Sequence, residues 1–201
     1  MMLISVYCSG SIVKGAGDQQ RLCWTDVERE EVAGGAAPCG VVFLNPDDPI
    51  PDAGNTLGQF GRDMYQVMVA TAVVVDARVR RGIGIGVEMA AAVTLGTPVI
   101  VVAPRNSQYR SDVLEYRGVR VTDYVHPHVA ALATKVVDDF AAAGRALVAL
   151  ADRPRAAQPR PAWLSAALDE YENNVLDIDA PMLDALRRIR AGAARVPSTT
   201  A

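Results

Sequence analysis

The chain has 201 residues, of which half are hydrophobic, and its formal net charge is −3. This length suits one packed domain with or without an appendage, and the hydrophobic content excludes a disordered chain. The weakly acidic balance offers no basic excess for a phosphate backbone, so nucleic acid is not expected as a main partner.

The three cysteines, Cys8, Cys23 and Cys39, are spaced neither as a disulfide framework nor as a Cys-x-x-Cys metal site. A reducing cytoplasm is therefore the expected location, and no basic segment of the signal-peptide type precedes the first apolar run. The longest apolar run, 89–103, is shorter than the roughly 18 to 20 residues of a membrane span. We expect a cytoplasmic protein that has no membrane partner and needs no metal or cofactor.

The first part of the chain alternates short apolar runs with helical patterns. Residues 2–8 (MLISVYC) predict a buried strand, residues 18–32 a helix that ends at the Gly34-Gly35 pair, and residues 40–44 (GVVFL) a second strand. The proline-rich stretch 45–54 predicts a loop.

The alternation continues further along the chain. The predicted elements are a helix over 57–70, a strand over 71–77, a helix over 86–95, a strand over 98–104, a candidate fifth strand over 119–124 and a long amphipathic helix over 127–150. Continuous apolar strands between helices imply a parallel sheet that is covered on both faces. We therefore predict a doubly wound α/β fold of Rossmann or flavodoxin type, with a mostly parallel five-stranded sheet and a C-terminal helical appendage.

Composition divides the chain into four segments. Residues 1–151 form the predicted α/β domain, and residues 152–162, rich in proline and arginine, predict a linker. Residues 163–193 predict an appendage of two short helices, and residues 194–201 a frayed tail.

Ligands of doubly wound folds bind beyond the carboxyl ends of the strands, where the stretches 9–17, 45–56 and 77–88 are expected to converge. The first of these, SGSIVKGAG, offers backbone N–H groups and a helix N-terminus for an anion, and Lys14 adds positive charge. A plain tight turn is the alternative interpretation.

Three alternating glycines, Gly82, Gly84 and Gly86, precede Glu88. Glycines permit unusual dihedral angles and the close approach of a ligand to the backbone. Glu88 is expected in the first turn of a helix, where the macrodipole keeps a carboxylate ionised. A carboxylate aimed at a sugar C1′ can attack it, as in retaining glycosidases. Acidic residues also occur in first helical turns for stability alone, and this alternative stays open.

Several other polar residues have two interpretations. Asp63 interrupts an apolar helix face and would point at the sheet edge, or it is a surface carboxylate paired with Arg62. Arg78 could bind a phosphate or lie on a solvated face. His126 and His128 have no obvious third ligand and are interpreted as surface loop residues.

Three motifs occur in order over roughly residues 3–125. The first strand ends in YCSGSI, a D-x6-A pattern leads from Asp63 into the valine strand, and G-x-G-x-E runs from Gly84 to Glu88. Together they resemble the nucleoside 2-deoxyribosyltransferase family. The likeness is greatest to its hydrolase branch, the 2′-deoxynucleoside 5′-phosphate N-hydrolases and the CMP-cleaving N-glycosidases.

This resemblance implies roles for individual residues. Glu88 would attack C1′ and form a glycosyl-enzyme intermediate, Asp63 would protonate or orient the leaving base, and Tyr7 would orient Glu88. A homodimer or higher homo-oligomer with shared active sites is also implied, in which Ser111 reaches a neighbour's phosphate site. The expected substrate-binding residues are Gly10, Ser11, Ile12, Val13, Lys14, Gly15, Asn45, Gly82, Gly84, Gly86 and Ser111.

The expected function is hydrolysis of the N-glycosidic bond of a nucleoside 5′-monophosphate to free base and (deoxy)ribose 5-phosphate. Base exchange by a nucleoside 2-deoxyribosyltransferase and a non-catalytic nucleotide-binding sensor are the alternatives. The segment before Glu88 is one residue longer than in the deoxynucleotide hydrolases, and the loop 46–54 and the appendage are additions. These departures leave the base and the sugar open.

Overall fold

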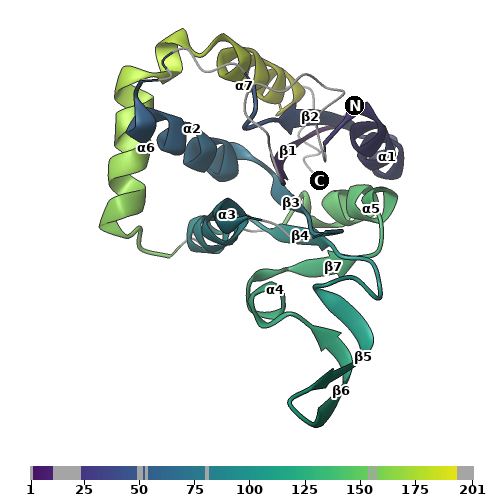
Figure 1. The fold of residues 1–201 in the computed structure, drawn as a ribbon. Coiled ribbons are helices and arrows are strands. Elements are labelled where there is room, and N and C mark those ends of the chain that lie inside the picture. The colour runs from purple at the N-terminus through teal and green to yellow at the C-terminus, as the bar shows by residue number, and fades with distance from the viewer. Residues whose placement is uncertain are drawn as a thin grey trace.

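A five-stranded parallel sheet forms the centre of the computed structural model (Figure 1), which describes residues 2–10, 24–48, 52, 54–79, 82–153, 155 and 158–193. The strand order is β2-β1-β3-β4-β7, and every neighbouring pair is parallel. The strands are β1 (Leu3–Ser9), β2 (Gly40–Leu44), β3 (Ala72–Asp76), β4 (Val99–Val102) and β7 (Lys135–Val137). This is the flavodoxin-like order, so the predicted α/β fold is confirmed.

Helices cover both faces of the sheet (Figure 1). Alternate residues of each strand point to opposite faces, so Val73 and Val75 join one hydrophobic cluster while Val74 joins the other. One face is covered by α1 (Asp26–Ala36) and α5 (Phe140–Leu150). The other is covered by α2 (Thr56–Val69), α3 (Ile83–Leu95), α4 (Pro127–Leu132), α6 (Ala162–Asn174) and α7 (Ala180–Ala193).

The fifth strand of the sheet is not the one that the sequence predicted. Residues 119–124 belong to β6 (Val119–Val125), which pairs antiparallel with β5 (Arg110–Tyr116) in a hairpin that projects from the body (Figure 1). The fifth strand, β7, lies inside the segment 127–150, where one long helix was predicted.

The segment 127–150 is therefore divided into α4, β7 and α5. Val136 and Val137 are β-branched and favour a strand. Asp139 then caps α5 by accepting a hydrogen bond from the backbone N–H of Ala142 at 2.6 Å. The apolar positions alone did not reveal these two boundaries, because alanine-rich stretches keep a helical pattern across them.

Helix α1 also differs from its prediction. It begins at Asp26, where Thr25 and Glu28 form a capping box, and it continues through Gly34 and Gly35 to Ala36. A Cβ on Gly35 would lie 2.1 Å from the carbonyl oxygen of Ala141 in α5. The glycine therefore allows close contact between two helix backbones and does not end the helix.

The C-terminal helices pack on α2 and on the edge of the sheet, where α6 lies along α2 and α7 contacts β1 and β2. The connecting segment is bonded to the body, because Arg155 donates to the carbonyl oxygens of Met68 at 3.0 Å and Ala70 at 2.5 Å. The backbone N–H of Gln158 donates to the Thr94 carbonyl at 2.9 Å. The expected tail, 194–201, lies outside the described residues.

None of the helices within the described ranges is long and apolar enough to cross a membrane.

Replacing Gly35 with alanine is expected to lower the free energy of unfolding by about 1–3 kcal/mol, because the new methyl group overpacks the contact with α5. Gly34 is a matched control in the same helix, where an added Cβ meets nothing within 4 Å. Gly34→Ala should raise the free energy of unfolding by up to about 1 kcal/mol through helix propensity. Urea denaturation followed by circular dichroism measures both, and equal effects would contradict the close helix contact.

Candidate functional site

A crevice is expected where the sheet order reverses. Strand β1 has β2 on one side and β3 on the other, so the connections leave it in opposite directions. Ser9 ends β1, Asp76 ends β3, and Glu88 lies in α3, the helix that follows β3. These three polar residues are thereby placed at the carboxyl edge of the sheet.

Glu88 is bonded to the end of β1. The Ser9 hydroxyl, which is buried, donates to Oε2 of Glu88 at 2.5 Å. The carboxylate also lies near Gly84, one turn earlier in α3, where an added Cβ would make an ordinary contact with Oε1 of Glu88 at 3.8 Å. The Glu88 side chain thus points back toward the N-terminus of its helix, as helical side chains do.

Tyr7 lies beside this carboxylate, and Asp63 lies near Tyr7. The Tyr7 side chain is fully buried, and its hydroxyl makes no hydrogen bond of regular geometry within the described part of the chain. The pKa of Tyr7 is raised well above its ordinary value by burial and then by the nearby carboxylates of Glu88 and Asp63. The structure therefore brings together the three residues that the sequence nominated for catalysis.

Burial raises the pKa of Glu88, while contacts with the hydroxyls of Ser9 and Tyr7 lower it without cancelling that effect. Helix α3 begins at Ile83, so Glu88 lies in its second turn. The prediction that it lies in the first turn is wrong. The macrodipole acts mainly within the first turn. Burial and hydroxyl contacts, rather than the helix end, govern the titration of this carboxyl.

The three glycines before Glu88 do not form a loop of unusual dihedral angles. Gly82 is the N-cap of α3 with φ −76°, and Gly84 and Gly86 lie within the helix. Among the described glycines, positive φ occurs at Gly96 and Gly118. A Cβ at Gly82 or Gly86 would meet nothing within 4 Å, so both positions border open space.

Arg78 is held in an ion-pair network behind the crevice. Its guanidinium donates to Oδ1 of Asp76 at 3.0 Å and to Oε1 of Glu28 at 2.7 Å, and it lies 4.8 Å from the ring centroid of Phe140. Both carboxylates raise the pKa of Arg78. The network joins the end of β3 to α1, so neither the phosphate site nor the solvated face considered for Arg78 describes it.

Arg62, next to Asp63 in α2, is directed toward the C-terminal helices. It is fully buried and forms an ion pair with the buried carboxylate of Asp179, which also accepts a hydrogen bond from the Tyr171 hydroxyl at 2.8 Å. Asp179 in turn accepts the backbone N–H of Met182 at 3.1 Å, in the first turn of α7. This cluster fixes the turn of α2 that carries Asp63.

The other nominated residues are distributed differently. Asn45 lies buried just after β2 and accepts the backbone N–H of Asp47 at 3.1 Å, while Gly10 directly follows β1. Ser111 lies in β5 of the projecting hairpin (Figure 1), where its hydroxyl donates to a hairpin carbonyl at 2.7 Å. Ser11, Ile12, Val13, Lys14 and Gly15 lie outside the described residues.

Ser9 was not nominated from the sequence. It is the last residue of a mostly apolar strand and stands at the carboxyl edge of the sheet. A polar residue that ends such a strand is the signal that could have identified it.

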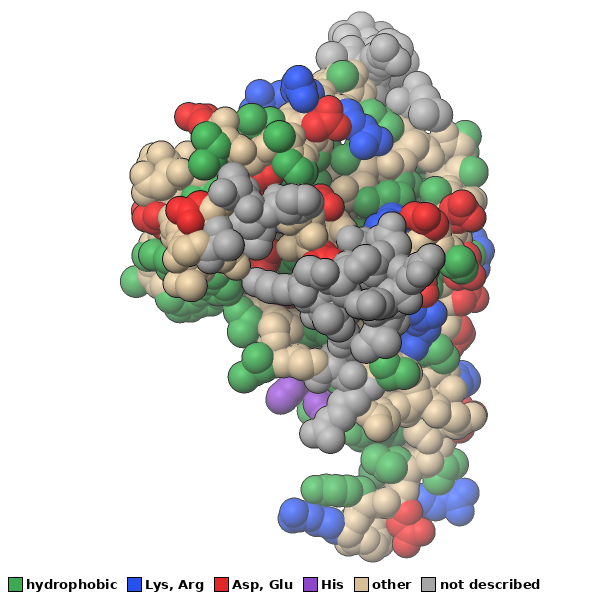
Figure 2. Space-filling model, turned by 45° about the horizontal axis from the view of Figure 1, so that its top comes forward, with side chains coloured by type: hydrophobic (Ala, Val, Ile, Leu, Met, Phe, Trp, Pro, Cys, Tyr) green, Lys and Arg blue, Asp and Glu red, His purple; other side chains and the backbone are tan. Residues whose placement is uncertain are grey.

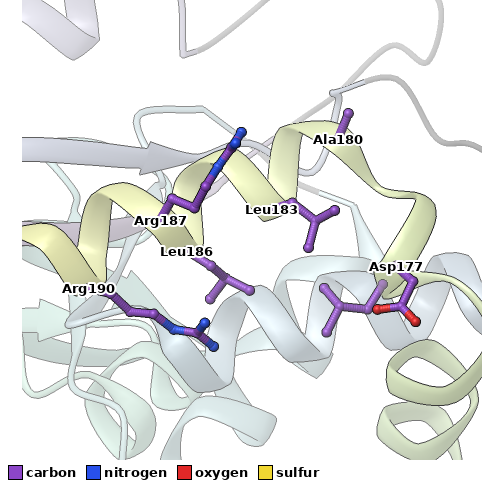
Figure 3. A pocket seen from close by; sticks show the side chains of 7 residues that line it. Asp177, Ala180, Leu183, Leu186, Arg187 and Arg190 are labelled. Atoms are coloured by element: carbon purple, nitrogen blue, oxygen red, sulfur yellow. The ribbon is translucent and has the colours of Figure 1, made fainter.

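Two sizeable hollows are among those that the described residues form outside this cluster. One, of about 410 Å³, lies beside the N-terminus of α3 and includes His126 and His128 in its lining. The other, of about 480 Å³, lies on α7, where Leu183 and Leu186 flank it and Arg187 and Arg190 stand along the helix (Figure 3). No group of three or more His, Cys, Asp or Glu residues placed to hold a metal ion occurs in the described ranges.

No protein-family model matches the sequence, and neither does any curated protein sequence. Among solved structures, the chain is similar to "2-desoxiribosyltransferase from Leishmania mexicana", with a TM-score of 0.47 and 19% sequence identity. The similarity covers 73% of this chain and 97% of that chain. A likeness at this level concerns the fold and assigns no activity.

Replacing Asp179 with alanine is expected to lower the free energy of unfolding by about 3–5 kcal/mol, because it leaves the buried Arg62 without its partner. Asp184→Ala is the control, since its ion pair with Arg187 at 3.3 Å is exposed to solvent. That loss should stay within about 1 kcal/mol. Equal losses in urea denaturation would mean that the buried pair does not hold the C-terminal helices.

The raised pKa of Glu88 predicts a pH-dependent difference between the wild type and Glu88→Gln. The folded carboxyl keeps its proton to higher pH than the unfolded one, so its contribution to stability is lost as pH rises through the folded value. Glu88→Gln cannot ionise and should gain stability relative to the wild type as pH rises above about 4.3. Urea denaturation of both proteins at a series of pH values tests this, and parallel profiles would exclude a raised pKa.

Proposed function

We propose that the chain is an N-glycosidase that hydrolyses a nucleoside 5′-monophosphate to free base and (deoxy)ribose 5-phosphate. The observation that carries this proposal is the meeting of Glu88, Asp63 and the buried Tyr7 hydroxyl at the carboxyl edge of the sheet. These groups come from α3, α2 and β1, so their meeting does not follow from local spacing. A buried hydroxyl and two carboxylates at the carboxyl edge of such a sheet suit acid–base and nucleophilic chemistry.

In the proposed reaction, the Glu88 carboxylate attacks C1′ of the sugar as the C–N bond to the base breaks. The base leaves with a proton supplied by Asp63, and a glycosyl ester on Glu88 remains. Water then attacks C1′, the ester bond breaks, and the carboxylate of Glu88 is restored. Asp63 takes up a proton from this water and is ready for the next cycle.

Glu88 has to be ionised to act as the nucleophile, although burial favours its neutral form. The hydroxyls of Ser9 and Tyr7 favour the ionised form and hold the carboxylate at the end of β1. Ser9 is therefore proposed as a positioning residue that acts through Glu88. The buried Tyr7 hydroxyl makes no regular hydrogen bond to the described residues, and a sugar oxygen of the substrate would satisfy it.

The preference for a phosphorylated substrate rests on the sequence, through Lys14 and the small-residue turn 9–17. An active site shared between two copies is part of the proposal. The outer face of α3, away from the hollow beside its N-terminus, is apolar and exposed, with Val87 and Val93 each 37% exposed. A helix that is apolar on all sides is normally buried, so a second copy is proposed to cover it, with Ser111 of the hairpin completing the neighbour's phosphate site.

Base release from a panel of ribo- and deoxyribonucleoside 5′-monophosphates, followed by chromatography, tests the function. The wild type should release base from at least one of them, and Glu88→Gln should reduce release to background. Asp63→Asn should lower kcat by about 10²- to 10⁴-fold, the usual contribution of a general acid. Glu115→Gln, on the exposed hairpin, is the matched control and should retain full activity.

Other outcomes would change the proposal in defined ways. Equal cleavage of nucleosides and their monophosphates would remove the phosphate preference. With a second base present, transfer product in excess of free sugar would favour base exchange. Tight binding of a monophosphate without turnover, unchanged in Glu88→Gln, would favour the sensor.

A further inference from the structure

The hollow beside α3 is separate from the Glu88 cluster. Glu88, Asp63, Tyr7 and Ser9 are absent from its lining, which includes Gly82 and Gly86 on the adjoining flank of the same helix. Val75 and Ala77 place it at the carboxyl end of β3. Its volume of about 410 Å³ lies within the range of roughly 300–1,000 Å³ that small-molecule sites occupy.

The walls of the hollow are mostly apolar. Ile85 and Met89 of α3 and Val129 of α4 contribute to them, and none of the described residues that line the hollow is Lys, Arg, Asp or Glu. A phosphate or carboxylate ligand would therefore lose its water without gaining an opposite charge. This chemistry favours an uncharged ligand with extended apolar faces.

One side of the hollow carries a row of aromatic rings. The ring centroids of Tyr109 and His126 are 5.4 Å apart, those of His126 and His128 are 5.1 Å apart, and both pairs meet edge to face. The backbone N–H of His126 donates to the Tyr109 carbonyl at 2.8 Å, and this bond holds the two residues side by side. The two histidines of the chain lie together on the surface near the hairpin (Figure 2).

His126 also has an unmet hydrogen-bonding need. Its Nδ1 is buried and has no hydrogen-bond partner among the described residues. Buried polar atoms are nearly always paired, so this nitrogen is suited to a ligand atom in the plane of a ring. Met89 also lines the hollow, and thioethers make favourable contacts with aromatic rings.

We propose that this hollow binds a free nucleobase, a flat and uncharged nitrogen heterocycle. Its faces would pack on the apolar wall and Met89, and a ring nitrogen would bond Nδ1 of His126. The choice of a nucleobase among heteroaromatic rings rests on the proposed function. The preference for a flat, uncharged ring rests on the aromatic and apolar lining alone. A base bound there lies across the first turns of α3 from Glu88.

The histidine ring signals in proton NMR test this on the wild-type protein. The chain has two histidines, and both line the hollow, so the spectrum reports on it directly. Adding adenine, cytosine, uracil or hypoxanthine should shift these signals in a saturable manner for at least one base. Signals that move on dilution of the protein and not on addition of a base would identify a second copy as the occupant and overturn the proposal.

Variants locate the binding site. A Cβ at Gly86 meets nothing within 4 Å, so Gly86→Leu should fold while its side chain fills the hollow. We expect it to abolish base binding in equilibrium dialysis, His126→Ala to weaken binding at least tenfold, and Glu88→Gln to leave it unchanged. Loss in Glu88→Gln with retention in Gly86→Leu would place the base in the Glu88 crevice and refute the inference.

This measurement is independent of turnover. Base binding that depends on His126, with no base release from any nucleotide, would leave the inference standing and remove the proposed function. Base release without base binding at the hollow would support the proposed function and overturn the inference.

Discussion

The central sheet is parallel throughout, and such a sheet needs cover on both of its faces because its strands are apolar on both. Strands β3 and β4 are fully buried. On one face, α1 and α5 meet through backbone contact at Gly35 and Gly144 and form a tight layer. On the other face, α2 and α3 are joined by the C-terminal helices, whose Leu164, Tyr171 and Met182 share the buried cluster of Val73. The appendage therefore completes the core.

The reversal of strand order at β1 also explains why polar groups gather where they do. Because β2 and β3 lie on opposite sides of β1, the connecting helices diverge and leave the carboxyl end of β1 open. The buried hydroxyls of Ser9 and Tyr7 lie there against the Glu88 carboxyl, whose pKa burial raises and these hydroxyls lower in part. The ion pairs of Arg78 with Asp76 and Glu28 join this edge of the sheet to α1. A carboxyl with a raised pKa is thus held at this edge beside an ion-pair network, and such groups are often found at functional sites.

The sequence predicted the elements whose pattern is local and long enough to recognise. Strands β1 to β4 are continuous apolar runs, and α2 keeps its helical spacing from end to end. Strand β7 has three residues between alanine-rich helices, which is too few for a period to appear. Tyr7, Asp63 and Glu88 were nominated through ordered motifs. The pair of Arg62 and Asp179 spans 117 residues, so no spacing rule could join them. The hollow beside α3 depends on how α4 and the histidines fold back, which no single segment specifies.

The buried pair also bears on how the chain is made. A ribosome delivers Arg62 well before Asp179, and the 117 residues between them take roughly 6 to 25 seconds at ordinary rates of synthesis. Through that interval the guanidinium has no buried carboxylate to receive it, and the α2 face of the sheet lacks its outer helices. The domain cannot close around its core until α7 has emerged. The α2 face therefore stays open until α7 has been made, and up to that point the growing chain carries an apolar face that has to be kept from other proteins.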